Sequence, residues 1–204
     1  MKTRRLLLLL GLVCLSLPRA AMATASLSVS VLAPAEAPTG YVRFCASDPA
    51  PCRETPASHP GDLSPADWLT IAAINSGVNH SIRPATDLSL FGESEHWAIA
   101  RKAGDCEDYV LLKQARLESL GFGSARLLIT VVADEHGEGH AVLTVTDGAQ
   151  TRILDNRRDD MLTPAETGYR FLKRQSAENP LHWERLTPTS PEMPRVLTAM
   201  EAGG

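Results

Sequence analysis

Three side chains in this sequence are of the types that carry out nucleophilic catalysis: Cys106, His140 and Asp155. A histidine can take the proton of a thiol, and an aspartate beside it fixes the tautomer and the plane of the imidazole ring. The thiolate that results is the form of cysteine that attacks a carbonyl carbon. Because the three residues are far apart in the sequence, the fold must bring them together.

The predicted hairpin around Asp147-Gly148 decides whether the histidine and the aspartate can meet. This dipeptide separates two stretches of alternating apolar residues, His140 to Val145 and Thr151 to Asp155, and it favours a two-residue turn with positive φ at both positions. Such a turn places His140 directly opposite Asp155, on one face of the sheet. A turn two residues longer makes the pair diagonal and keeps the shared face, whereas a one-residue slip separates it.

Cys106 is expected at the start of a helix that ends near Gly121. Free backbone N–H groups and the positive end of the helix dipole favour a thiolate at that position. Asp105 and Glu107 oppose this effect, because carboxylates on either side repel a negative sulfur. A nearby imidazolium, a bound cation, or both must therefore offset the two acids.

The N-terminus has the pattern of a secretory signal. A basic start precedes an apolar run from Leu6 to Leu17, and small residues follow as far as Ala23. We predict that residues 1–23 are removed, which leaves a periplasmic or secreted protein with no stable membrane insertion; an uncleaved anchor and a lipoprotein at Cys14 are the alternatives. Cleavage takes away four basic and no acidic residues, which changes the formal net charge from −4 to −8. An acidic chain has no basic field for nucleic acid.

The cysteines fit an exported chain, because thiols tend to pair in an oxidising compartment. Cys45 and Cys52 flank a turn-rich segment that can bring their Cα atoms to roughly 4.4–6.8 Å. We predict a disulfide between them; the alternative is a pair of small buried apolar side chains. Cys106 then remains as the unpaired thiol.

The chain divides into four segments: the signal peptide (1–23), an irregular proline-rich strap (24–63), one folded domain (64–187) and a flexible tail (188–204). Within the domain, Ser64-Pro65 predicts the start of a helix that runs to about Asn79. The helix at Cys106 follows. Strands are then expected at 126–132, 140–145, 151–155, 169–175 and around Trp183. Helices followed by an antiparallel sheet indicate an α+β fold, with the N-terminal helices packed on the sheet.

Three short motifs occur in the order of a known family: GDCEDY at 104–109, GEGHAVL at 137–143 and LDN at 154–156. With them the chain resembles the bacterial transglutaminase-like cysteine proteinases. The resemblance implies a papain-like or transglutaminase-like core. It also implies that Cys106 is the nucleophile, His140 the general base and then acid, and Asp155 the carboxylate that orients the histidine.

The same resemblance suggests a cofactor and a substrate class. Well-known members are periplasmic calcium-dependent proteases that release biofilm adhesins, and in them acidic residues beside the nucleophile serve calcium. Calcium ligation is thereby implied for Asp105 and Glu107, and Asp87 is a further candidate whose alternative is an ordinary surface-loop residue. We expect an exported cysteine peptidase that cleaves an envelope or surface protein. The alternatives are acyl transfer to an amine and a non-catalytic, calcium-responsive envelope binding module.

Overall fold

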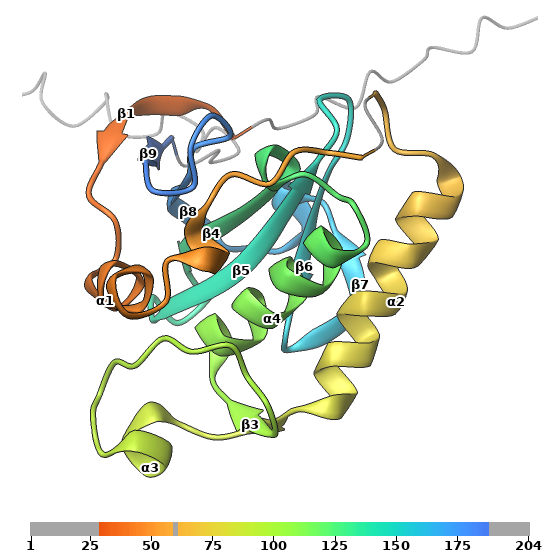
Figure 1. Cartoon of the computed structure of the whole chain (residues 1–204). Coiled ribbons are helices and arrows are strands. Elements are labelled where there is room, and N and C mark those ends of the chain that lie inside the picture. Colours follow the sequence, from red (N-terminus) through yellow and green to blue (C-terminus); the bar gives the residue numbers. More distant parts are fainter. Residues whose placement is uncertain (1–28, 59–60, 188–204) are drawn as a thin grey trace, which may run out of the picture.

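The computed structural model describes residues 29–58 and 61–187. The predicted signal peptide and C-terminal tail lie outside these residues. Within them, no helix has the length and apolar character that crossing a membrane requires. The predicted α+β class is confirmed, because helices pack on a large antiparallel sheet (Figure 1).

The main sheet has seven strands in the order β1-β9-β8-β4-β5-β6-β7, and neighbouring strands are antiparallel. Its strands are β1 (Val31–Ala35), β4 (Leu127–Ala133), β5 (Gly139–Thr146), β6 (Thr151–Asp155), β7 (Arg158–Leu162), β8 (Arg170–Gln175) and β9 (Trp183–Leu186). Two short strands, β2 (Arg83–Pro84) and β3 (Ala103–Gly104), pair in parallel outside this sheet. Strand β4, which corresponds to the strand predicted at 126–132, lies at the centre of the main sheet and is buried along most of its length.

The helices are α1 (Thr39–Ser47), α2 (Pro65–Ser81), α3 (Asp87–Phe91) and α4 (Cys106–Ser119), with 3₁₀ turns at Ala50–Cys52, Ser124–Arg126 and Pro164–Glu166. Helix α4 packs on β5, and α2 packs against α4 and β7 (Figure 1). Leu143 and Val145 of β5 join Val110 and Leu117 of α4 in the main core. The alternation predicted for β5 is therefore confirmed, since Val142 belongs to a separate apolar cluster with Ile153 of β6.

The start of α2 follows the predicted signal. The hydroxyl of Ser64 accepts a hydrogen bond from the backbone N–H of Asp67, whose carboxylate accepts in return from the backbone N–H of Ser64. This reciprocal pair satisfies two donors that a helix start otherwise leaves free. The helix then runs to Ser81, two residues beyond the expected end.

The prediction of an irregular strap over residues 24–63 is wrong for its described part. This part contains β1, which adds to the sheet edge beside β9, and the nine-residue helix α1. Tyr41 and Phe44 of α1 are buried in the main core. Pro34 lies within β1 and Pro38 directly precedes α1. Neither prevents the helix, because burial of two aromatic side chains stabilises it.

The two-residue turn predicted between β5 and β6 is also wrong. Thr146 pairs with Thr151, so the loop consists of the four residues 147–150. The Asp147 carboxylate accepts hydrogen bonds from the backbone N–H groups of Ala149 and Gln150, which stabilises the longer loop. Leu143 pairs with Leu154, and by the same register Asp155 lies diagonal to His140. The pair therefore keeps its shared face, as expected for a turn longer by two residues.

Candidate active site

His140 and Asp155 form a buried hydrogen-bonded pair. The Nε2 atom of His140 lies 2.9 Å from Oδ1 of Asp155, and each side chain is 1% exposed. Because a carboxylate oxygen accepts here, Nε2 carries a proton. The other ring nitrogen, Nδ1, is therefore the one that can accept a proton from another group.

Asp155 is held in its ionised form. Burial alone would raise the pKa of its carboxyl, but the hydrogen bond from His140 and the charge of that ring lower it, together with donation from the backbone N–H of Arg157 and the hydroxyl of Tyr169. The resulting pKa is about 2. Asp155 thus stays charged at neutral pH and stabilises a proton on the imidazole.

Cys106 lies at the first turn of α4, as predicted. Cys106 and His140 both line a cavity of about 500 Å³, whose wall also includes Trp97, Glu95 and Val131. The backbone N–H of Ala141, the residue that follows His140, donates toward the sulfur. Cys106 and His140 are therefore both residues of one cavity wall.

The thiol of Cys106 points at a carboxylate in this structure. Among the described residues its hydrogen-bond acceptor is Glu107, with Sγ 3.0 Å from Oε2, and not His140. Burial raises the pKa of the thiol well above its ordinary value, and the charge of Glu107 raises it further. The electrostatic obstacle expected from the sequence is therefore present, and the helix start alone does not overcome it.

Asp87, Asp105 and Glu107 converge beside the cysteine. One oxygen from each carboxylate lies within 4.8 Å of the other two. Asp87 is buried, which rules out the alternative of an ordinary surface-loop acid. Asp105 precedes α4 but does not cap it with its side chain; instead its Oδ2 accepts from the backbone N–H of Asp87 at 3.2 Å.

This cluster fits a hard divalent cation. Oδ1 of Asp87 and Oδ1 of Asp105 are buried and have no hydrogen-bond partner among the described residues. Burial and the charge of Asp105 raise the pKa of Glu107 to about 8, and burial also raises the pKa of Asp87. Converging carboxylate oxygens are the ligands that Ca²⁺ accepts. The residues present are therefore suited to calcium.

Sequence reasoning missed several residues that support the site. Tyr169 binds the second oxygen of Asp155, Arg157 binds Asp134, and Asp108 accepts from the backbone N–H of Ala98. Gly104 allows the close approach of Asp108, since a Cβ at residue 104 would lie 2.5 Å from Oδ2 of Asp108. The sequence places Tyr169 at the start of a predicted strand (169–175), but no local pattern shows which residue its hydroxyl binds.

The structure contains the predicted disulfide between Cys45 and Cys52, with their Cα atoms 5.8 Å apart. It joins the end of α1 to the 3₁₀ turn that follows, and Cys52 is buried in the main core. Cys106 is the free cysteine of the described residues. The bond secures α1, whose first residues, with Pro38, form one wall of the cavity at Cys106.

The fold and the placement of the thiol define a class. A cysteine at the start of a helix that packs on an antiparallel sheet, with a histidine on the neighbouring strand, is the arrangement of a transglutaminase-like α+β core. Over residues 31–190 the sequence matches the family described as bacterial transglutaminase-like cysteine proteinase, BTLCP. The chain belongs to this family of cysteine proteinases, and the resemblance seen in its motifs is confirmed.

Solved structures of a Legionella pneumophila protein, LapG, are similar to this chain. The calcium-bound form is 26% identical, with a TM-score of 0.49, and the match covers 60% of this chain and 71% of that one. The EGTA-treated form is 25% identical, with a TM-score of 0.46 and coverage of 54% and 63%. A third LapG structure is 25% identical, with a TM-score of 0.46, and the match covers 54% of this chain and 65% of that one. No curated protein matched the sequence.

Proposed function

We propose that this protein is an exported cysteine peptidase that cleaves a peptide bond in an envelope or surface protein through Cys106, His140 and Asp155. The observation that carries the proposal is the buried hydrogen bond between His140 Nε2 and Asp155 Oδ1, at 2.9 Å, on the wall of a cavity that Cys106 also lines. This bond leaves Nδ1 of the histidine as the proton acceptor. Membership of the family supports proteinase activity. The hydrogen bond and the shared cavity wall support catalytic roles for these three residues.

The proposed reaction has two halves. His140 Nδ1 takes the thiol proton, the sulfur bonds to the carbonyl carbon, and the C–N bond breaks as the imidazolium returns the proton to the leaving amine. Water then loses a proton to His140 and attacks the thioester, which releases the carboxylic acid and restores the thiol. Asp155 stays ionised through both halves and stabilises the imidazolium.

Calcium is proposed as the cofactor, held by Asp87, Asp105 and Glu107. When bound, it would supply positive charge beside the cysteine. Glu107 is the acceptor of the thiol proton in this structure, so any group that engages its oxygens frees the sulfur to face His140. The solved LapG structures include a calcium-bound and an EGTA-treated form.

The compartment follows from the disulfide and from the predicted signal. Disulfides persist in secreted and periplasmic proteins and are rare in a reducing cytosol. The Cys45–Cys52 bond therefore supports export. The substrate is then a protein that reaches the same envelope space and offers an extended segment to the cavity.

The test compares the N-termini of envelope proteins in a wild-type strain and in a strain with Cys106→Ala. We expect at least one internal N-terminus that the wild type produces and the variant lacks. A strain carrying Thr70→Ala, a substitution on the exposed surface of α2, is the matched control and should keep that terminus. Identical N-termini in all three strains would contradict the proposal. Adding a primary amine to the purified enzyme and the cleaved segment separates hydrolysis from acyl transfer.

A further inference from the structure

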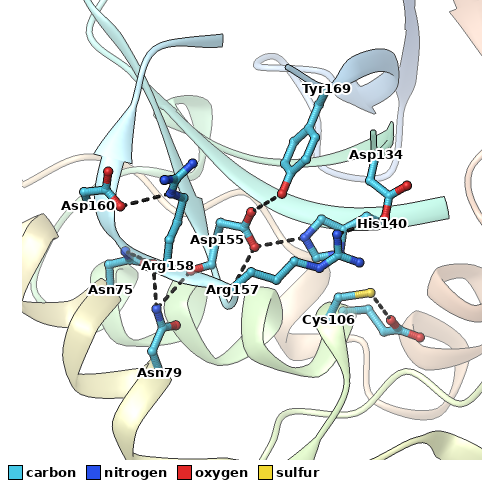
Figure 2. Close-up of polar contacts among 11 residues, drawn as sticks. Asn75, Asn79, Cys106, Asp134, His140, Asp155, Arg157, Arg158, Asp160 and Tyr169 are labelled. Atoms are coloured by element: carbon cyan, nitrogen blue, oxygen red, sulfur yellow. Dashed lines mark hydrogen bonds and ion pairs between the residues drawn. The ribbon is translucent and has the colours of Figure 1, made fainter. Parts of the chain in front are cut away.

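Both oxygens of the Asp155 carboxylate are bound, and they are bound by different groups. Oδ1 accepts from His140 Nε2 at 2.9 Å and from the backbone N–H of Arg157 at 3.0 Å. Oδ2 accepts from the hydroxyl of Tyr169 at 2.7 Å (Figure 2). A rotation of the carboxylate would break the bonds on both sides at once. The Tyr169 hydroxyl is thus the group that fixes the far side of the carboxylate.

The ring of Tyr169 also contacts the histidine. Its centroid lies 5.7 Å from that of the His140 ring, at an interplanar angle of 78°, which is a favourable edge-to-face arrangement. One side chain therefore touches both members of the pair, with its hydroxyl on Asp155 and its ring on the imidazole. A residue that only filled space would need the ring but not the hydroxyl.

The position of Tyr169 is itself constrained. Gly168 has a φ of +73°, a conformation that L side chains rarely adopt, and it turns the chain just before β8. The backbone N–H of Tyr169 donates to the hydroxyl of Thr167 at 3.1 Å. The ring packs against the apolar cluster that contains Phe171 and Ile153. These contacts direct the hydroxyl toward Asp155.

Arg157 ties this group to the loop before His140. Its guanidinium interacts with the Tyr169 hydroxyl and donates to Oδ2 of Asp134 at 2.9 Å. Oδ1 of Asp134 accepts from the backbone N–H groups of His136 and Glu138, each at 2.9 Å. The histidine lies only two residues beyond that loop. The same connected set of bonds therefore holds the backbone before His140 and the carboxylate that binds its ring.

We propose that Tyr169 is a positioning residue of the candidate active site: its hydroxyl fixes the Asp155 carboxylate so that His140 keeps its proton on Nε2 and presents Nδ1 to Cys106. The inference rests on the proposed function for its consequence, but its geometric content concerns His140 and Asp155 alone. Burial and the hydrogen bond to Asp155 raise the pKa of Tyr169 to about 12, so the hydroxyl remains a donor over the working range of pH.

The test uses Tyr169→Phe, which removes the hydroxyl and keeps the ring. In the full chain with ¹⁵N-labelled histidine, the His140 ring nitrogens of the wild type should report a single neutral tautomer with the proton on Nε2. The variant should show both tautomers. Loss of a hydrogen bond to a charged group should also slow alkylation of Cys106 by iodoacetamide, at neutral pH in calcium, by about tenfold or more.

Tyr109→Phe is the matched control. The Tyr109 hydroxyl is buried and donates to the backbone oxygen of Ile82 at 2.6 Å, so this variant also loses a buried hydrogen bond, but away from Asp155. It should lower thermal stability and leave the His140 tautomer unchanged. If Tyr169→Phe keeps the wild-type ¹⁵N pattern and alkylation rate, the positioning role is overturned while the proposed function stands. If Cys106→Ala keeps wild-type cleavage, the proposed function fails, and the ¹⁵N pattern still decides the role of Tyr169.

Discussion

Asp155 and Glu107 are both buried carboxylates of the candidate active site, yet their pKa values move in opposite directions, to about 2 and about 8. The difference lies in their neighbours. Asp155 accepts from an imidazole, a hydroxyl and a backbone N–H. Glu107 lies among carboxylates, of which Asp105 and Glu95 raise its pKa further.

The comparison shows that one half of the site is complete and the other is not. The histidine half, defined here as His140, Asp155 and Tyr169, satisfies its buried charge with donors of this chain. The cysteine half is defined as Cys106 with Asp87, Asp105 and Glu107. In residues 29–58 and 61–187 no lysine, arginine or histidine forms an ion pair with these three acids. This lack of a paired positive charge among the described residues is the physical reason for the proposed calcium.

Near the histidine half, Lys113 of α4 is a fully buried charged side chain whose Nζ lacks a hydrogen-bond partner among the described residues. Burial lowers its pKa to about 7, against the attraction of Asp155 and Asp159. The unfolded chain therefore binds more protons than the folded one between about pH 7 and the ordinary lysine pKa of roughly 10.4. In this window the lysine makes stability rise with pH.

Replacing Lys113 with methionine should remove that contribution, which is the largest of the effects predicted here. The free energy of unfolding of the wild type should rise relative to Lys113→Met by about 1.4 kcal/mol for each pH unit from pH 7 to 10. Urea unfolding at several pH values measures this difference, and the titration of Cys106 cancels because both proteins contain it. The exposed Lys102→Met is the control. If the free energies of unfolding of Lys113→Met and the wild type differed by the same amount at every pH, the lowered pKa of Lys113 would be contradicted.

Calcium should produce the next largest effect, and it should act through the cysteine half alone. At a calcium concentration about 100 times Kd, binding to the folded state adds about 2.7 kcal/mol, or roughly 5–10 °C in Tm for a domain of this size. Asp105→Asn should remove most of the shift between EGTA and calcium. The exposed Asp160→Asn should keep it. A Tm that calcium leaves unchanged in the wild type would show that the acidic cluster needs no cation.

The parts of the fold that sequence reasoning predicted are those with local signals. Ser64 and Pro65 define the start of α2, and the almost unbroken apolar run at β4 is typical of a strand buried on both faces. The shared face of His140 and Asp155 was also predictable, because it depends only on the parity of the register. The exact turn length was not, since the Asp147 carboxylate binds two backbone N–H groups within the loop.

Features that depend on contacts between distant segments could not be predicted from one sequence. Helix α1 forms in a proline-rich segment because Tyr41 and Phe44 find a core made by other elements. The hydroxyl of Tyr169 reaches Asp155 only because the chain turns at Gly168 before β8. The acids beside Cys106 were recognised as an electrostatic problem, but the burial of Asp87 beside them depends on how the loop that contains α3 folds back.

The central claim is that the two halves act together on one sulfur. The most direct measurement is the rate of Cys106 alkylation by iodoacetamide at pH 7 in calcium, followed by mass spectrometry, in the wild type and in His140→Ala. The wild type should react faster than His140→Ala by about tenfold or more, because a positioned base contributes roughly 10²-fold or more to proton removal. Equal rates in the two proteins would contradict the central claim.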